Sequence, residues 1–164
     1  MMRNGGVPVY DDHLLYEQLI LESFSAGLSW LIILKKRENF RKAFDNFDID
    51  KVIAYDEAKV EALMQDKGIV RSRAKILATI SNSKIIKDIQ KEYGTFSNYL
   101  WGYTNHEIIY QDDVTLTKSE LSDCIAKDLK KRGMKFCGSV TIFAYLQAVG
   151  IVNSHEPSCF KYRK

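Results

Sequence analysis

The sequence contains few of the residues that interrupt helices or cross-link a chain. Its 164 residues include two prolines, Pro8 and Pro157, which stand near the ends and leave the interior free to form helices. The three cysteines, Cys124, Cys137 and Cys159, have no regular spacing, which argues against a disulfide framework and predicts a reducing, cytoplasmic location. They are also too few for an iron–sulfur cluster held by four cysteines.

Long apolar runs are also missing. No run approaches the roughly 20 residues that a membrane-spanning helix needs, and the first residues lack the apolar core of a signal peptide. We therefore expect no association with a membrane. Hydrophobic residues still make up 46% of the chain, enough for one globular domain over residues 1–164.

The basic residues are grouped rather than scattered. The formal net charge is only +3. The groups are Lys35–Arg37; Lys67, Arg71, Arg73 and Lys75; Lys127, Lys130–Arg132 and Lys135; and Lys161, Arg163 and Lys164. Any single group could be an ordinary solvated face, but four groups near predicted helix ends favour a polyanionic partner such as nucleic acid.

The helical signals start near the N-terminus. Asp11 and Asp12 can cap a first helix over 13–25, which is apolar on nearly every side and is therefore expected to be buried. Glu22 follows Leu19 by three residues on the same stripe, so its carboxylate faces inward. A carboxylate in that position needs a partner or a function.

Further helices follow along the chain. Gly27 ends the first helix, and Ser29 can start a second that runs to about Phe44. We expect further helices over 49–54, 56–64, from about 72 onward, 96–103, after a capping box at Thr117-x-x-Glu120, and over 135–149. The sequence therefore predicts a single all-α domain.

One stretch combines features that suit recognition of a nucleobase next to a phosphate backbone. It contains the acid Glu22, a turn at Gly27, the aromatic Trp30 and the basic run 35–37. Taken alone, each residue has an ordinary explanation. Glu22 can be a core carboxylate that pairs with Arg37 or Arg41, and Trp30 can be a core residue.

A second stretch, residues 63–80, resembles a helix-hairpin-helix element. Asp66-Lys67-Gly68-Ile69-Val70 forms a glycine-containing turn between two predicted helices, and such a turn lets backbone N–H groups approach a DNA phosphate. Val70 stands where the usual pattern has a second glycine. An ordinary connection between helices is the alternative, although the basic residues that follow favour DNA.

His155 and Cys159 form an H-x3-C pair near the C-terminus. Such a pair supplies half of a tetrahedral zinc site, which needs four ligands. From the composition alone, an accidental pair is the more ordinary explanation.

The order of these motifs carries a family resemblance. L-E-S-F-S-A-G-L-S-W-L-I-I-L-K-K-R-E-N-F, D-K-G-I-V-R-S-R-A-K-I and L-K-K-R-G-M-K-F-C-G-S-V-T succeed one another along the chain. From Gly6 to Cys159 the sequence closely resembles the DNA-3-methyladenine glycosylase I family, within the helix-hairpin-helix DNA glycosylases. The resemblance implies excision of N3-methyladenine from alkylated double-stranded DNA by a monomeric, monofunctional enzyme.

The resemblance also implies residue roles. Glu22 would be the catalytic acid that hydrogen-bonds the extruded base, and Trp30 would stack against that base. Gly27 and Leu28 would lie against the gap left in the duplex. The expected contacts with the DNA backbone are Lys67, Gly68, Ile69, Val70 and Arg71.

His155 and Cys159 match two of the four ligands of the family's structural zinc. The other two ligands, and a second aromatic residue that touches the base, belong to an N-terminal segment that these 164 residues do not include. We therefore expect weakened zinc binding and weakened activity. Two rival functions stay open: a DNA-binding helical protein of the same fold that has lost catalysis, and a glycosylase or lyase for another lesion.

Overall fold

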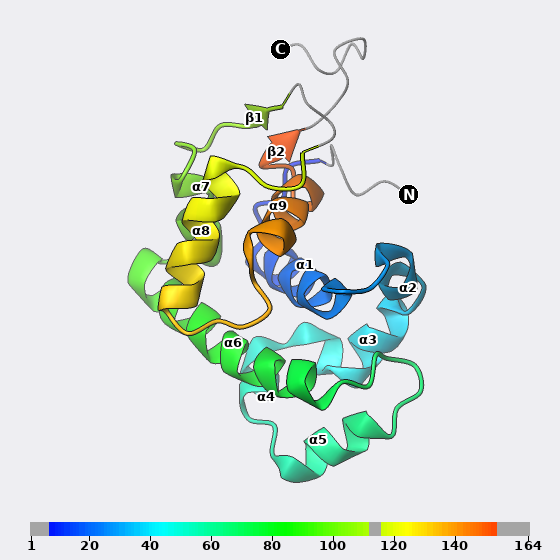
Figure 1. Ribbon diagram of the computed structural model, residues 1–164. Coiled ribbons are helices and arrows are strands. Elements are labelled where there is room, and N and C mark those ends of the chain that lie inside the picture. Colours follow the sequence, from blue (N-terminus) through cyan, green and yellow to red (C-terminus); the bar gives the residue numbers. More distant parts are fainter. Residues whose placement is uncertain (1–6, 112–115, 154–164) are drawn as a thin grey trace.

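A central helix, α1 (Asp12–Ser25), organises the computed structural model, which describes residues 7–111 and 116–153 (Figure 1). The other elements in chain order are α2 (Trp30–Lys35), α3 (Arg37–Ala43), the 3₁₀ segment η1 (Asp45–Phe47), α4 (Ile49–Ile53), α5 (Glu57–Met64), α6 (Arg73–Tyr93), α7 (Phe96–Gly102), β1 (Ile109–Tyr110), α8 (Glu120–Lys131), α9 (Ser139–Ala148) and β2 (Val152–Asn153). The predicted all-α fold is confirmed. The short parallel pair β1–β2 is a small addition.

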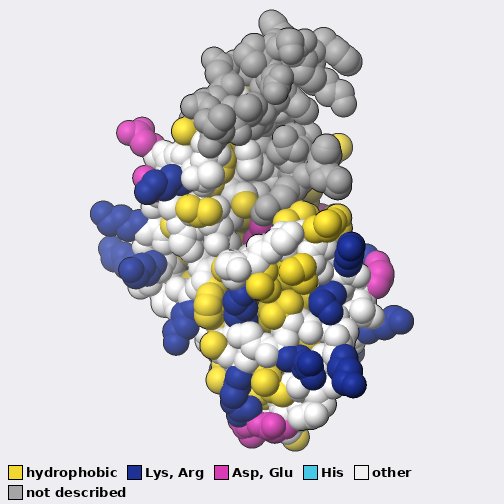
Figure 2. Space-filling model, turned by 45° about the vertical axis from the view of Figure 1, so that its right-hand side comes forward, with side chains coloured by type: hydrophobic (Ala, Val, Ile, Leu, Met, Phe, Trp, Pro, Cys, Tyr) yellow, Lys and Arg dark blue, Asp and Glu magenta, His cyan; other side chains and the backbone are white. Residues whose placement is uncertain are grey.

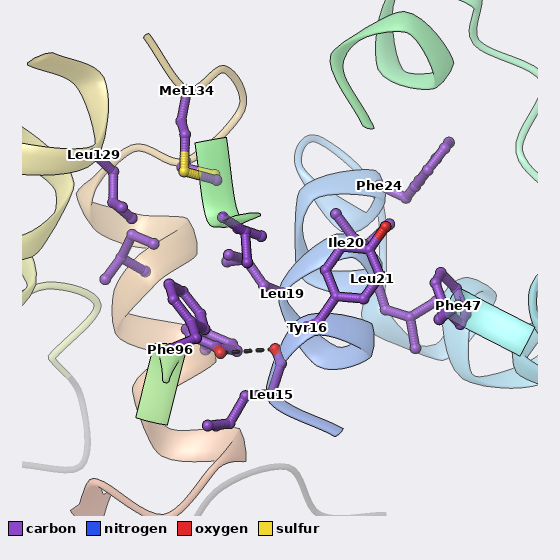
Figure 3. Close-up of a cluster of buried hydrophobic side chains, with 14 of the residues drawn as sticks. Leu15, Tyr16, Leu19, Ile20, Leu21, Phe24, Phe47, Phe96, Leu129 and Met134 are labelled. Atoms are coloured by element: carbon purple, nitrogen blue, oxygen red, sulfur yellow. Dashed lines mark hydrogen bonds between the residues drawn. The ribbon is translucent and has the colours of Figure 1, made fainter. Parts of the chain in front are cut away.

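Helices surround α1 on several sides. In Figure 1, α7, α8 and α9 lie to one side of α1, whereas α2 to α5 lie to the other, and the long α6 passes along both groups. Side chains of α1 therefore meet both halves of the core. Figure 3 shows Leu129 and Met134 beyond one side of the helix and Phe47 beyond the other.

The start of α1 differs from the prediction in one respect. Asp11 caps the helix as expected, since its carboxylate accepts the amide of Leu14 at 3.1 Å. Asp12 does not cap α1. Its carboxylate accepts the backbone amides of Phe96 and Ser97, each at 2.8 Å, at the first turn of α7. A long-range bond thus replaces the local one and joins α7 to α1.

The predicted second helix, 30–44, is two helices. Ser29 caps α2 as expected, but Lys36 (φ −99°, ψ 5°) separates α2 from α3. The change of direction allows Phe40 of α3 to pack on Phe24 of α1, with 4.9 Å between ring centroids. Both aromatic rings are fully buried on the α1 side of the break.

The last two helices start later than predicted. The capping box of α8 is formed by Ser119 and Ser122 instead of Thr117 and Glu120. The last helix starts at Ser139 instead of residue 135, because the backbone of Lys135 is held by α6. The Asn82 side chain accepts the Lys135 amide at 2.9 Å and donates to its carbonyl at 2.8 Å.

Within the described residues, no helix has both the length and the apolar character needed to cross a membrane.

Candidate active site

A cavity of about 370 Å³ opens between the end of α1, the loop that follows it, and the start of α9. Its volume falls at the lower end of the range for small-molecule sites. The lining residues are Glu22, Ser25, Ala26, Gly27, Leu28, Val140, Thr141 and Ala144. We call this cavity the Glu22 pocket.

Glu22 is a buried carboxylate at the wall of this pocket. Its residue is 2% exposed, and its Oε2 accepts a hydrogen bond of 3.0 Å from the Gln18 side-chain amide. Arg37 and Arg41, the two arginines considered as partners of Glu22, both bind Glu17, at 3.3 and 2.8 Å. A buried acid that lines a cavity is well placed to bind a cationic or hydrogen-bond-donating ligand.

The polar groups behind Glu22 are connected. Arg37 donates to the Gln18 side-chain oxygen at 3.3 Å, which leaves the amide nitrogen of Gln18 to donate to Glu22. Glu17, buried at 1% exposure, in turn holds Arg37 and Arg41. This network fixes the orientation of the Gln18 amide, so that its nitrogen donates to the Glu22 carboxylate.

The loop that borders the pocket is tightly turned. The Leu28 amide donates to the Ser25 carbonyl at 2.7 Å, and Gly27 adopts a φ of +80°, which favours glycine. The turn directs Leu28 outward, with 42% of the residue exposed. An exposed leucine at the mouth of a pocket is suited to insertion into an apolar gap such as an unstacked base step.

Lys75 of α6 holds this loop from the inside. Its ammonium donates to the carbonyl oxygens of Phe24 at 2.8 Å and Ala26 at 2.6 Å, at the C-terminal end of α1. A cation at this end of a helix also complements the helix dipole. Burial lowers the pKa of Lys75. Sequence reasoning assigned this lysine to the DNA-binding cluster and missed its structural role.

The opposite wall of the pocket comes from α9, which sequence reasoning also missed. One face of this helix lines the pocket with Val140, Thr141 and Ala144. Ala144 follows the other two by four and three residues, the spacings that place side chains on the same face of a helix. Among the described residues, Trp30 is not part of the lining. It is the first residue of α2 and packs, partly buried, against the core. The structure therefore brings Glu22, Gly27 and Leu28 together and places Trp30 just beyond the loop.

The predicted hairpin is a tight turn between α5 and α6. The Gly68 amide donates to the Asp66 carboxylate at 2.8 Å, and a Cβ at Gly68 would lie 2.9 Å from the Asn39 side chain. Close approach of α3 therefore requires glycine here. Ile69 is 3% exposed and is a core residue, and its amide donates to the Asp66 carbonyl. No acceptor within 7–111 and 116–153 meets the amides of Val70 and Arg71.

The basic cluster after the turn is not uniformly available to a partner. Arg73 pairs with Glu57 and Glu61, and Lys75 is committed to the pocket loop. Lys67 and Arg71 are exposed. These two residues, with the amides of Val70 and Arg71, form the part of the hairpin that faces solvent.

The predicted zinc ligands His155 and Cys159 lie outside the described residues. Within the described part of the chain, no group of three or more histidine, cysteine or acidic side chains is arranged to hold a metal ion.

Comparison with known proteins places this architecture in a family. The model of the methyladenine glycosylase family matches residues 3–162. DNA-3-methyladenine glycosylase 1 of Escherichia coli is 42% identical over 161 residues, which cover 96% of this chain and 86% of that protein. The corresponding values for DNA-3-methyladenine glycosylase of Haemophilus influenzae are 39%, 96% and 87%.

A solved structure of 3-methyladenine DNA glycosylase I from Staphylococcus aureus, which concerns the recognition of 3-methyladenine, superposes with a TM-score of 0.91. It is 36% identical to this chain, and the match covers 98% of this chain and 88% of that one. Sequence and fold agree over nearly the whole chain. The protein therefore belongs to the methyladenine glycosylase family.

Proposed function

We propose that this protein excises N3-methyladenine from alkylated double-stranded DNA, acting as a monomeric, monofunctional glycosylase. The observation that carries the proposal is the buried Glu22 carboxylate at the wall of a cavity whose mouth carries an exposed leucine. The relatives named for action on 3-methyladenine support the choice of base.

The chemistry demands little of the protein. Methylation at N3 makes the base cationic, so the base is a good leaving group. The bond between C1′ of the sugar and N9 breaks, and its electron pair stays with the base, which departs neutral. Water adds to C1′ and its proton passes to solvent. A carboxylate that accepts hydrogen bonds from the cationic base favours it over neutral adenine.

The surrounding residues have supporting roles in this proposal. A base must leave the duplex before it can enter the pocket. Leu28 would fill the gap that the base leaves, and Trp30, at the start of α2 beside the loop, would stack on the extruded base. Lys67 and Arg71 would hold the backbone through the hairpin. Zinc enters no step of the reaction.

The test is to identify the bases released from methylated DNA by mass spectrometry. Release of 3-methyladenine, without release of adenine, is the expected result. DNA binding without release of any base would contradict the proposal and favour the non-catalytic rival. Trapping of a covalent DNA adduct by borohydride would contradict the monofunctional assignment.

A further inference from the structure

A second cavity lies beside the Glu22 pocket, on the α8 side of α9. It has a volume of about 640 Å³, and three lysines line it: Lys127, Lys130 and Lys135. Phe136 and Ser139 also contribute to its wall. We call this cavity the α8–α9 groove. None of the roles assigned above uses it.

The charge of the groove is positive. All three lysines are exposed, and none has an ion pair with a carboxylate within the described residues. One acid, Asp123, also lines the groove, and its carboxylate accepts the hydroxyl of Ser139 at 2.5 Å. Three cations facing one anion attract a polyanion.

The neighbouring Arg132 does not contribute to the positive charge of the groove. It pairs with Asp128 at 2.8 Å and with Glu92 at 3.0 Å, so it is a structural cation that joins α8 to α6. The basic cluster seen in the sequence is therefore divided. The lysines of the groove remain for a partner, and the arginine does not.

The groove and the Glu22 pocket share one turn of α9. Ser139 lines the groove, and the next two residues, Val140 and Thr141, line the pocket. On the other side of the pocket, α2 leads toward the hairpin, where the Lys36 ammonium donates to the Lys67 carbonyl at 3.4 Å. The pocket therefore lies between two basic surfaces.

The surface between them is apolar. Leu28, Leu31, Ile32 and Val140 are each at least 40% exposed. Figure 2 shows hydrophobic side chains gathered on one face of the molecule with Lys and Arg side chains on both sides of them. Cations at both ends and an apolar middle match a duplex that is held by its backbone on both flanks and opened at the centre.

We propose that the α8–α9 groove binds backbone phosphates of the DNA duplex on the opposite side of the flipped nucleotide from the hairpin. This proposal rests on the proposed function for the identity of the DNA. It adds a second anchoring surface, which would hold the flank that the hairpin does not reach while the base is extruded.

The test uses the full chain and a duplex that carries a tetrahydrofuran abasic analogue at its centre. Lysine-to-glutamine variants K127Q, K130Q and K135Q, and the triple variant, are titrated with DNA over a series of salt concentrations. Each phosphate contact that is lost should reduce the slope of log K against log salt by about 1. The control is K51Q, because Lys51 lines a different cavity beside Asp12, at the opposite end of α1.

A second pair of duplexes locates the contact. In each, the analogue lies near one end, so that one flank or the other is absent. The triple variant should match the parent protein on the duplex that lacks the groove flank and bind more weakly than the parent on the duplex that lacks the hairpin flank. Unchanged thermal unfolding confirms that the variants fold.

The proposal is overturned if the triple variant keeps the parent's salt slope. It is also overturned if the affinities of the triple variant and the parent differ by the same factor on both end-placed duplexes. These outcomes are separate from failure of the proposed function, which is read from base release by the parent protein. If the parent protein releases no base, the proposed function is contradicted. If the triple variant still binds more weakly than the parent only on the duplex that retains the groove flank, the groove proposal is supported.

Discussion

The Lys75 ammonium donates hydrogen bonds to the carbonyl oxygens of Phe24 and Ala26, at 2.8 and 2.6 Å, and so ties the first turn of α6 to the loop of the Glu22 pocket. The same nitrogen lies 5.8 Å from the ring centroid of Phe136, in the segment that precedes α9. One side chain therefore joins the hairpin helix to the pocket loop and to the segment that leads into α9.

Replacement of Lys75 by methionine should weaken excision more than DNA binding. Methionine keeps most of the apolar stem but leaves the two carbonyl groups without their donor. Loss of hydrogen bonds to a charged group costs about 1.5–3 kcal/mol, or roughly 10- to 100-fold in rate if the loss falls on the pocket. Single-turnover release of 3-methyladenine and affinity for the abasic duplex measure the two effects. Equal losses in both would show that Lys75 acts on the fold as a whole.

Leu28→Ala should reduce excision with little effect on stability. The side chain is exposed, so its removal should change the free energy of unfolding by no more than about 0.5 kcal/mol. Loss of the apolar wedge should make base extrusion less favourable. Leu77→Ala is the matched control, because Leu77 is similarly exposed, at 45%, on α6. Equal excision by the two variants would rule out a wedge role for Leu28.

Glu17→Ala should destabilise the fold by about 2 kcal/mol, because it leaves Arg37 and Arg41 without their buried partner. The effect is smaller than for a fully buried pair, since both arginine side chains are about 30% exposed. Glu38→Ala removes an exposed partner of the same Arg41 and should cost less than about 0.5 kcal/mol. Urea unfolding compares the two variants, and similar costs would contradict the assignment.

Cys137 should be unreactive in the native protein. Burial raises the pKa of its thiol to about 11, whereas the exposed Cys124 is accessible to reagents. Mass spectrometry after brief treatment with a thiol reagent near neutral pH should find Cys124 modified and Cys137 intact. Modification of both at equal rates would contradict the burial.

The raised pKa of Cys137 also predicts a pH dependence of stability. Between its usual value of 9.0 and about 11, the folded state retains the thiol proton that the unfolded state loses. The free energy of unfolding should therefore fall as the pH rises through this interval. Cys137→Val should lack this part of the decline, and parallel curves for the two proteins would contradict it.

Local signals in the sequence predicted local structure. Asp11, Ser29 and Ser72 cap the helices that follow them, as their side-chain chemistry indicates. The predicted helix starts were wrong where a residue distant in sequence binds the side chain or backbone that would otherwise have made a local hydrogen bond. Asp12 binds α7, and Asn82 holds Lys135 out of the last helix. Spacing along the chain does not reveal such long-range bonds.

The same contrast between local and long-range contacts decides how much of the site the sequence could predict. Glu22, Gly27 and Leu28 are close in sequence, and the structure brings all three to one pocket. The wall from α9 and the support from Lys75 depend on how distant helices pack, so no motif near Glu22 indicated them. The family resemblance linked Trp30 to the same base, but the pocket lining within the described residues does not include it.

The most direct test of the account is the Glu22→Gln variant, which keeps the shape of the side chain but removes its charge and replaces one acceptor oxygen with a donor nitrogen. If the carboxylate stabilises a cationic base, single-turnover release of 3-methyladenine should fall about 100-fold, the effect of losing a charge-assisted hydrogen bond of roughly 3 kcal/mol. Affinity for the abasic duplex should be unchanged, because that duplex has no base to bind. Release at the parent rate would contradict the central role of Glu22.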